Sequence, residues 1–134
     1  MSTELTYLLY TAILTGVLWV PVVCGYVTTR GFLSAQDYRV APTGPLPHWV
    51  NRANRAHANA VENFAAFAAV VLIADAAGVS TQWTQLAAAT YFFARLLHAI
   101  VHITGFGLFM ARTVIFSIAW FAFIVFAVEV LRMS

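Results

Sequence analysis

The residues best suited to chemistry in this sequence lie between positions 52 and 63, at the start of a long uninterrupted stretch. Nothing in this stretch breaks a helix before Ala74, and its length is close to what a membrane crossing needs. At about 100° per residue, one face of the helix collects cations, amides and one carboxylate. The residues on this face are Arg52, Arg55, Asn59, Glu62 and Asn63. Because a charge in hydrocarbon costs a few kcal/mol, the face either joins helices or binds a zwitterionic or anionic ligand.

A second polar group lies in the second half of the next apolar stretch. Tyr91, Arg95, His98 and His102 fall within an arc of roughly 60° on one helix. Arg95 needs a partner there, and Glu62 is the natural candidate because antiparallel neighbouring helices would place both residues at similar depth. Two histidines at i and i+4 could hold a metal, but no HExxH motif or third ligand accompanies them. We therefore predict no metal site and favour hydrogen bonding by both histidines in a cavity.

The composition is that of a membrane protein. Of the 134 residues, 62% are hydrophobic and 9% are charged, with a mean hydropathy of +0.82. A soluble domain of this length needs far more charge to cover its surface. All strong bases are arginines, and a net charge of +2 without a basic run argues against a nucleic-acid partner. The single cysteine excludes an intrachain disulfide.

The expected fold is all-α, an integral membrane four-helix bundle that forms one domain over residues 1–134. The expected helices cover residues 5–27, 50–74, 81–103 and 112–131. A cleaved signal peptide is the alternative for the first stretch, but no basic segment precedes it, so we expect a retained helix. Pro21 should kink that helix or mark an irregular turn. The proline- and glycine-containing segment 28–50 should be a loop.

The arginines predict the orientation and the kind of site. Four crossings put both termini on one side, and most arginines lie on the other side, which the positive-inside rule places in the cytoplasm. A cavity among them would open to the cytoplasm. Five arginines converge on one leaflet of a bundle too small to shield them: Arg30, Arg52, Arg55, Arg95 and Arg112. A symmetric oligomer would supply polar clefts, and guanidinium groups there would bind carboxylates or phosphates.

The run Arg52-x-x-Arg55-Ala56-His57-x-Asn59-x-x-Glu62-Asn63 resembles the second-helix signature of the MAPEG family. These are membrane-associated proteins in eicosanoid and glutathione metabolism. The similarity extends to segment 39–45, to Ala94-Arg95-x-x-His98 and to the arginine before the fourth helix, so it covers essentially the whole chain. The chain is thus similar to microsomal glutathione transferases, microsomal prostaglandin E synthase and the leukotriene-forming synthase.

The resemblance implies a homotrimer in the lipid bilayer, with glutathione as co-substrate in a cleft between neighbouring subunits. It implies Arg112 as the catalytic residue beside the glutathione sulfur. The implied glutathione-binding residues are Arg30, Arg52, Arg55, Asn59, Glu62, Arg95, His98 and His102. The sequence departs from many members at His102, where they have a tyrosine.

The chemistry of glutathione suits these residue types. Its two carboxylates match arginines, and its ammonium matches Glu62. A free thiol has a pKa of about 8.5, and a fixed cation such as Arg112 would lower it and increase the nucleophilic thiolate. We therefore expect a glutathione-dependent transferase or peroxidase acting on apolar electrophiles or lipid hydroperoxides. The alternatives are a non-catalytic lipid- or partner-binding membrane protein and a small transporter or channel. Little polar lining in the first and fourth helices argues against the last.

Overall fold

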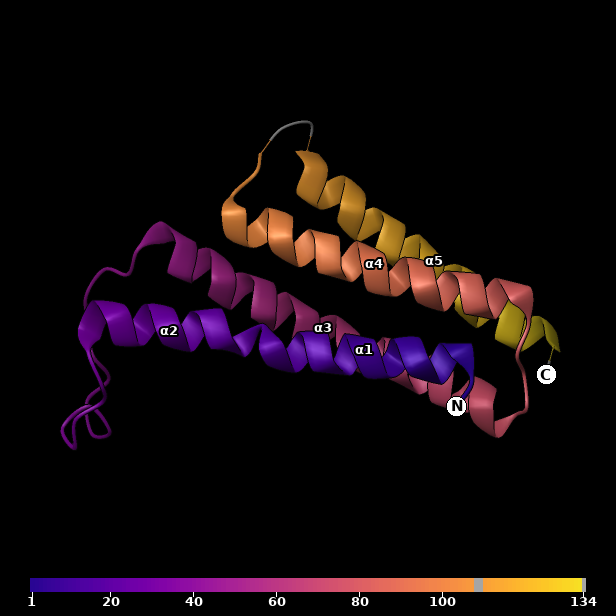
Figure 1. Ribbon diagram of the computed structural model, residues 1–134, viewed down its shortest axis with the longest axis horizontal. Coiled ribbons are helices and arrows are strands. Elements are labelled where there is room, and N and C mark those ends of the chain that lie inside the picture. The colour runs from indigo at the N-terminus through magenta and orange to yellow at the C-terminus, as the bar shows by residue number, and fades with distance from the viewer. Residues whose placement is uncertain (108–109, 134) are drawn as a thin grey trace.

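The computed structural model describes residues 1–107 and 110–133, and over these residues every regular element is a helix (Figure 1). The helices are α1 (Thr3–Val17), α2 (Trp19–Arg30), α3 (His48–Ala76), α4 (Gln82–Thr104) and α5 (Ala111–Met133). Four segments in this part of the chain are long and apolar enough to cross a membrane, with α1 and α2 forming the first. The predicted all-α membrane protein with four crossings is confirmed. Each predicted helix bound lies within three residues of the observed one.

The first crossing is broken at Leu18, between α1 and α2. Pro21 lies three residues further on and has no N–H to donate to the carbonyl of Val17, which is the last residue of α1. The proline ring also crowds that carbonyl. The N–H of Leu18 still donates to the Leu14 carbonyl at 3.0 Å, so the break is local and the helix resumes at once. The irregularity predicted from Pro21 is confirmed.

The helix α4 lies at the centre of the bundle, against α1, α3 and α5. In contrast, α2 packs only on α1 and α3. The core between the central helices is aromatic: the rings of Phe67 and Tyr91 stack with centroids 3.8 Å apart, and Phe126 meets Phe67 edge-on. This packing fixes the depth and rotation of α3, α4 and α5 relative to one another.

At one end of the bundle, hydrogen bonds close a buried polar cluster that we call the closed end. The start of α1 and the end of α5 meet the α3–α4 turn there (Figure 1). The Glu4 carboxylate accepts from the hydroxyls of Ser80 at 2.9 Å and Thr84 at 2.6 Å. Glu129 accepts from the Thr81 hydroxyl at 3.1 Å, while Thr81 and Thr84 form the capping box of α4. The first and fourth crossings therefore carry more buried polar groups than the sequence suggested.

The opposite end holds the segment between α2 and α3, which is the predicted loop. Arg30, the last residue of α2, donates to the carbonyls of Pro42 and Gly44 and ties the loop to the helix. Asp37 accepts from the backbone N–H and the hydroxyl of Ser34, and these two bonds lower the pKa of the Asp37 carboxyl.

Candidate functional site

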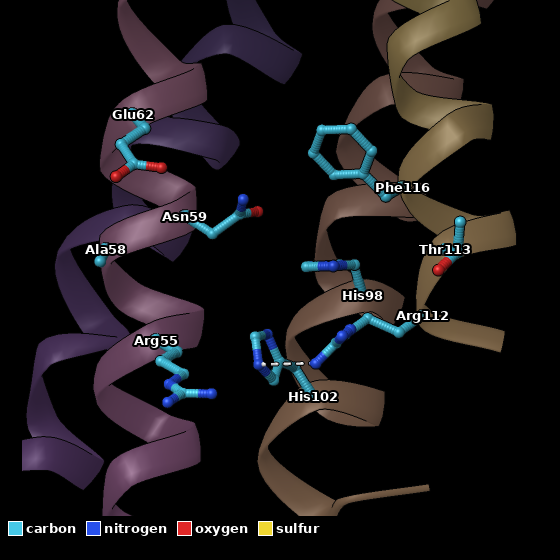
Figure 2. Close-up of a pocket in the computed structure, with 9 residues that line it drawn as sticks. All are labelled: Arg55, Ala58, Asn59, Glu62, His98, His102, Arg112, Thr113 and Phe116. Carbon is cyan, nitrogen blue, oxygen red and sulfur yellow. Dashed lines mark hydrogen bonds between the residues drawn. The ribbon is translucent and has the colours of Figure 1, made fainter. Parts of the chain in front are cut away.

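A hollow of about 480 Å³ opens at the loop end of the bundle, between α3, α4 and α5 (Figure 2). We call it the arginine hollow. Six of the residues predicted for the site line it: Arg55, Asn59 and Glu62 from α3, His98 and His102 from α4, and Arg112 from α5. The other lining residues are Ala58, Thr113 and Phe116. The long uninterrupted α3 and the central α4 thus carry the two predicted polar faces to one place.

The polar faces reach the hollow because apolar packing turns them there. The face of α4 that carries Tyr91, Arg95, His98 and His102 is buried against its neighbours, with between 4% and 9% of each residue exposed. Tyr91 is fixed from both sides, because its ring stacks on Phe67 and its hydroxyl donates to the Asn63 carbonyl at 3.1 Å. The arc predicted from the sequence therefore points inward.

Arg52 lies beside the arginine hollow rather than in it. It lines an adjoining hollow of about 450 Å³, together with His102 and Arg112. Its Nε donates to the Ile103 carbonyl at 3.0 Å in the last turn of α4, where a cation is favoured by the helix dipole. Gly105 ends α4 in the left-handed conformation, and a Cβ there would lie 3.0 Å from the Arg52 guanidinium. Arg52 is thereby committed to α4.

Arg95 does not pair with Glu62, so the predicted ion pair is wrong. Its Nη2 donates instead to the backbone carbonyl and the side-chain Oδ1 of Asn59, each at 2.9 Å. Asn59 lies nearly a turn before Glu62 on α3 and so comes first within reach of the buried guanidinium. Because Oδ1 is taken by Arg95, the amide Nδ2 of Asn59 is left to donate to a ligand. Arg95 itself lies below the arginine hollow and lines a smaller one of about 170 Å³.

Glu62 and Arg55 are the free charges of the arginine hollow. Within residues 1–107 and 110–133, neither side chain has a hydrogen-bond or ion-pair partner, and both are exposed. Figure 2 shows both on α3, on the side that faces α4 and α5. A cation and a carboxylate held apart in this way can bind the opposite charges of one zwitterionic molecule.

His102 lies between the helices and contacts the third cation of this end. Its Nε2 is 3.5 Å from Nη1 of Arg112, while its ring meets that of His98 edge-on with centroids 5.5 Å apart. Arg112 opens α5 one residue after its start, and its guanidinium points back toward α4 (Figure 2). A cation in this position can stabilise an anion that forms inside the hollow.

Arg30 is not brought to the hollow of its own chain. It sits at the end of α2, which contacts neither α4 nor α5. Its guanidinium is held by loop carbonyls and lies over the Tyr26 ring at 5.3 Å from the centroid. The helix α3 separates it from His102 and Arg112, so a site within one subunit excludes it.

Sequence reasoning missed two lining residues, Thr113 and Phe116. Phe116 lies 5.8 Å from the Arg95 guanidinium and 5.9 Å from the His98 ring, measured to its centroid, and so forms the apolar floor of the hollow. The signal was spacing alone, because both residues follow Arg112 at one and four positions on a helix and share its face. The uniform hydrophobicity of this helix hides that face.

A model of the MAPEG family matches residues 5–132, which is nearly the whole chain and includes every residue of the arginine hollow. No curated protein and no solved structure matches the chain.

Proposed function

The chain belongs to the MAPEG family, and on that premise we propose that it is a membrane-embedded, glutathione-dependent transferase or peroxidase. Its substrates would be apolar electrophiles or lipid hydroperoxides that reach the hollow from the bilayer. The observation that supports this most is that α3, α4 and α5 bring six predicted polar residues to one hollow. A helix face that served only to join helices would have its charges paired, whereas Arg55 and Glu62 are free among the described residues.

The charges of the hollow fit glutathione. Arg55 would hold one of its carboxylates, and Glu62 would hold its ammonium. The Asn59 amide, oriented by Arg95, would donate to a backbone carbonyl or a carboxylate of the tripeptide. In this proposal Arg95 acts through Asn59 rather than on glutathione directly, while Arg52 serves the rim of the site.

Arg112 would act on the thiol. Its charge stabilises the thiolate over the thiol, so that the nucleophile is present at neutral pH. In transfer, the sulfur forms a bond to an electrophilic carbon, and the leaving group or an accepted proton completes the product. In peroxide reduction, the sulfur takes the terminal oxygen as the O–O bond breaks. The lipid leaves as an alcohol, and a second glutathione thiol then gives glutathione disulfide and water.

The assembly that best accommodates the remaining predicted residue is a homotrimer. Arg30 is kept from its own hollow by α3, but it lies at the same end of the bundle as the arginine hollow. In a closed ring of identical subunits, Arg30 of each chain could face the hollow of the next. The clefts between subunits would then be the sites.

The hollow would open to the cytoplasm. In Figure 1 the loop and the α4–α5 connection lie at the end opposite the start of α1 and the end of α5. The loop end carries the loop arginines together with Arg52, Arg55 and Arg112, whereas Arg132 lies near the opposite end. The excess of arginines supports a cytoplasmic location of the loop end.

The test is a glutathione-dependent activity screen on the purified protein in detergent, with a model electrophile and a lipid hydroperoxide assayed in parallel. We expect turnover with at least one of them, and glutathione should raise the melting temperature. A glutathione analogue with a methyl group in place of the thiol is the matched control, since it should stabilise the protein without reacting. Stabilisation without turnover of either substrate would contradict the enzyme and favour a non-catalytic binding protein. Neither effect would contradict the glutathione site itself.

A further inference from the structure

The contact between His102 and Arg112 allows only one assignment of donor and acceptor. The dashed line in Figure 2 joins His102 Nε2 to Arg112 Nη1, at 3.5 Å. A guanidinium group only donates, so Nε2 must carry the lone pair. The ring proton of a neutral His102 is then on Nδ1. A protonated ring would place two donors against each other.

The other ring nitrogen has no use within the described part of the chain. His102 Nδ1 is buried and lacks a hydrogen-bond partner there, and only 9% of the residue is exposed. Moving the proton to Nε2 would leave Nδ1 as an unpaired acceptor and would also lose the contact with Arg112. A buried polar atom without a partner is uncommon and asks for an explanation. The explanation here is that Nε2 is needed as the acceptor for Arg112.

The surroundings of His102 are positively charged on every side. Arg52 and Arg55 face it from α3, and Arg112 faces it from α5. On its own helix the neighbouring titratable group is His98. Among the described residues that line the two hollows, the only carboxylate is Glu62. A proton on His102 would therefore add positive charge to three arginines and remove the acceptor of one of them.

We propose that neutral His102 is a positioning residue that holds Arg112 at the arginine hollow, and that protonation of His102 releases it. This inference rests on the proposed function for its catalytic consequence, because Arg112 is the group that stabilises the thiolate. Acidification then lowers activity in two separate ways. It protonates the thiol, and it frees the guanidinium that favours the thiolate.

The first test needs no glutathione. The full-length protein is labelled with nitrogen-15 in its four histidines and studied by NMR in detergent, and His102 is assigned by the signal lost in His102→Gln. We expect His102 to be neutral with its proton on Nδ1. In Arg112→Met, both tautomers should appear, because nothing then demands an acceptor at Nε2. A proton on Nε2 in the unmodified protein, or an identical pattern in Arg112→Met, would overturn the proposal.

The second test separates positioning from binding by kinetics. His102→Phe keeps the ring shape without an acceptor, and it should lower kcat by at least about tenfold while glutathione affinity stays within about threefold. His102→Gln supplies an acceptor that does not titrate, and it should restore most of kcat and lose part of the decline toward acid pH. His57→Gln is the control, since His57 lies on α3 outside both hollows. Full activity of His102→Phe, or the original pH profile in His102→Gln, would contradict the inference.

The two tests distinguish the failure of this inference from that of the proposed function. A protein without glutathione turnover would refute the enzyme, while the NMR experiment would still decide whether His102 holds Arg112. If His102→Phe does not fold, the comparison of the unmodified protein with Arg112→Met and His102→Gln gives the same decision.

Discussion

The two ends of this helical bundle use buried polar residues in opposite ways. At the closed end, the carboxylates of Glu4 and Glu129 accept hydrogen bonds from hydroxyls of the α3–α4 turn and the first turn of α4. At the other end, the described residues offer Arg55 and Glu62 no partner, and Arg112 meets only a histidine nitrogen. Both ends carry several charged side chains in helices that are otherwise apolar.

The difference separates polar residues that hold the fold from those available to a ligand. Hydroxyl donors and carboxylate acceptors at the closed end satisfy each other, apart from Glu4 Oε2, which has no partner among the described residues. At the arginine hollow, the same kind of pairing is withheld even though a carboxylate and two cations line one space. A charge left unpaired in a membrane protein is costly and points to a ligand. Substitutions at the two ends should therefore affect different properties.

The largest effect is expected for Arg112→Ala, which should lower kcat by about 100- to 1,000-fold because it removes the cation beside the thiolate. The melting temperature of the ligand-free protein should barely change, since no bond that holds the helices together is lost. Steady-state kinetics at saturating glutathione and thermal unfolding measure the two quantities. Arg39→Ala is the control, as it removes an exposed arginine from the loop at the same end. A marked loss of stability with unchanged turnover would make the two ends alike.

The next effect concerns binding. Arg55→Ala should weaken glutathione affinity by about tenfold to a hundredfold, because it removes a charge-assisted contact with a carboxylate. Titration calorimetry, or the glutathione-dependent rise in melting temperature, reports the change. Asn54→Ala alters the adjacent exposed position on α3, outside the arginine hollow, and should leave affinity unchanged. Equal affinities in the two variants would exclude Arg55 from the ligand site.

The closed end predicts the reverse pattern. Thr84→Val keeps the shape of the side chain but removes the hydroxyl that donates to Glu4 at 2.6 Å and accepts from the Thr81 N–H. With a buried carboxylate left short of a donor, we expect the free energy of unfolding to fall by about 1–3 kcal/mol. Glutathione affinity should stay the same. Thermal unfolding beside Thr28→Val tests this, because Thr28 is exposed and its hydroxyl bonds only within its own helix. Equal stability of the two variants would show that the closed end does not hold the fold.

Most of the fold was predictable because it follows from long apolar stretches. Helices of membrane length need no knowledge of packing, and the break at Leu18 follows from the missing N–H of Pro21. The closed end was not predictable in the same way. Glu4 lies near the start of the chain and Thr84 beyond the second turn, and only the antiparallel packing of α1 and α4 shows that they meet.

The site was predictable wherever one helix face carried the signal. The polar faces of α3 and α4 give the spacing of Arg55, Asn59 and Glu62 and of His98 and His102, and all five line the arginine hollow. The partner of Arg95 was mistaken because depth along a helix does not decide which of two residues a turn apart is within reach. The place of Arg30 could not be read from spacing, because it depends on which helix α2 packs against.

The smallest effect is expected at the rim of the closed end. Arg132 bonds both oxygens of Glu129, at 2.9 and 3.0 Å, but 66% of its side chain is exposed, so water and salt screen the pair. Arg132→Gln should lower the melting temperature by less than Thr84→Val does, because Glu129 keeps its bond from the Thr81 hydroxyl. Arg39→Gln removes the same charge from the exposed loop and controls for the change in net charge. A loss in Arg132→Gln as large as that in Thr84→Val would mean that the exposed ion pair, and not the buried hydroxyls, closes this end of the bundle. The two ends would then differ in how far their charges are exposed rather than in whether they are paired.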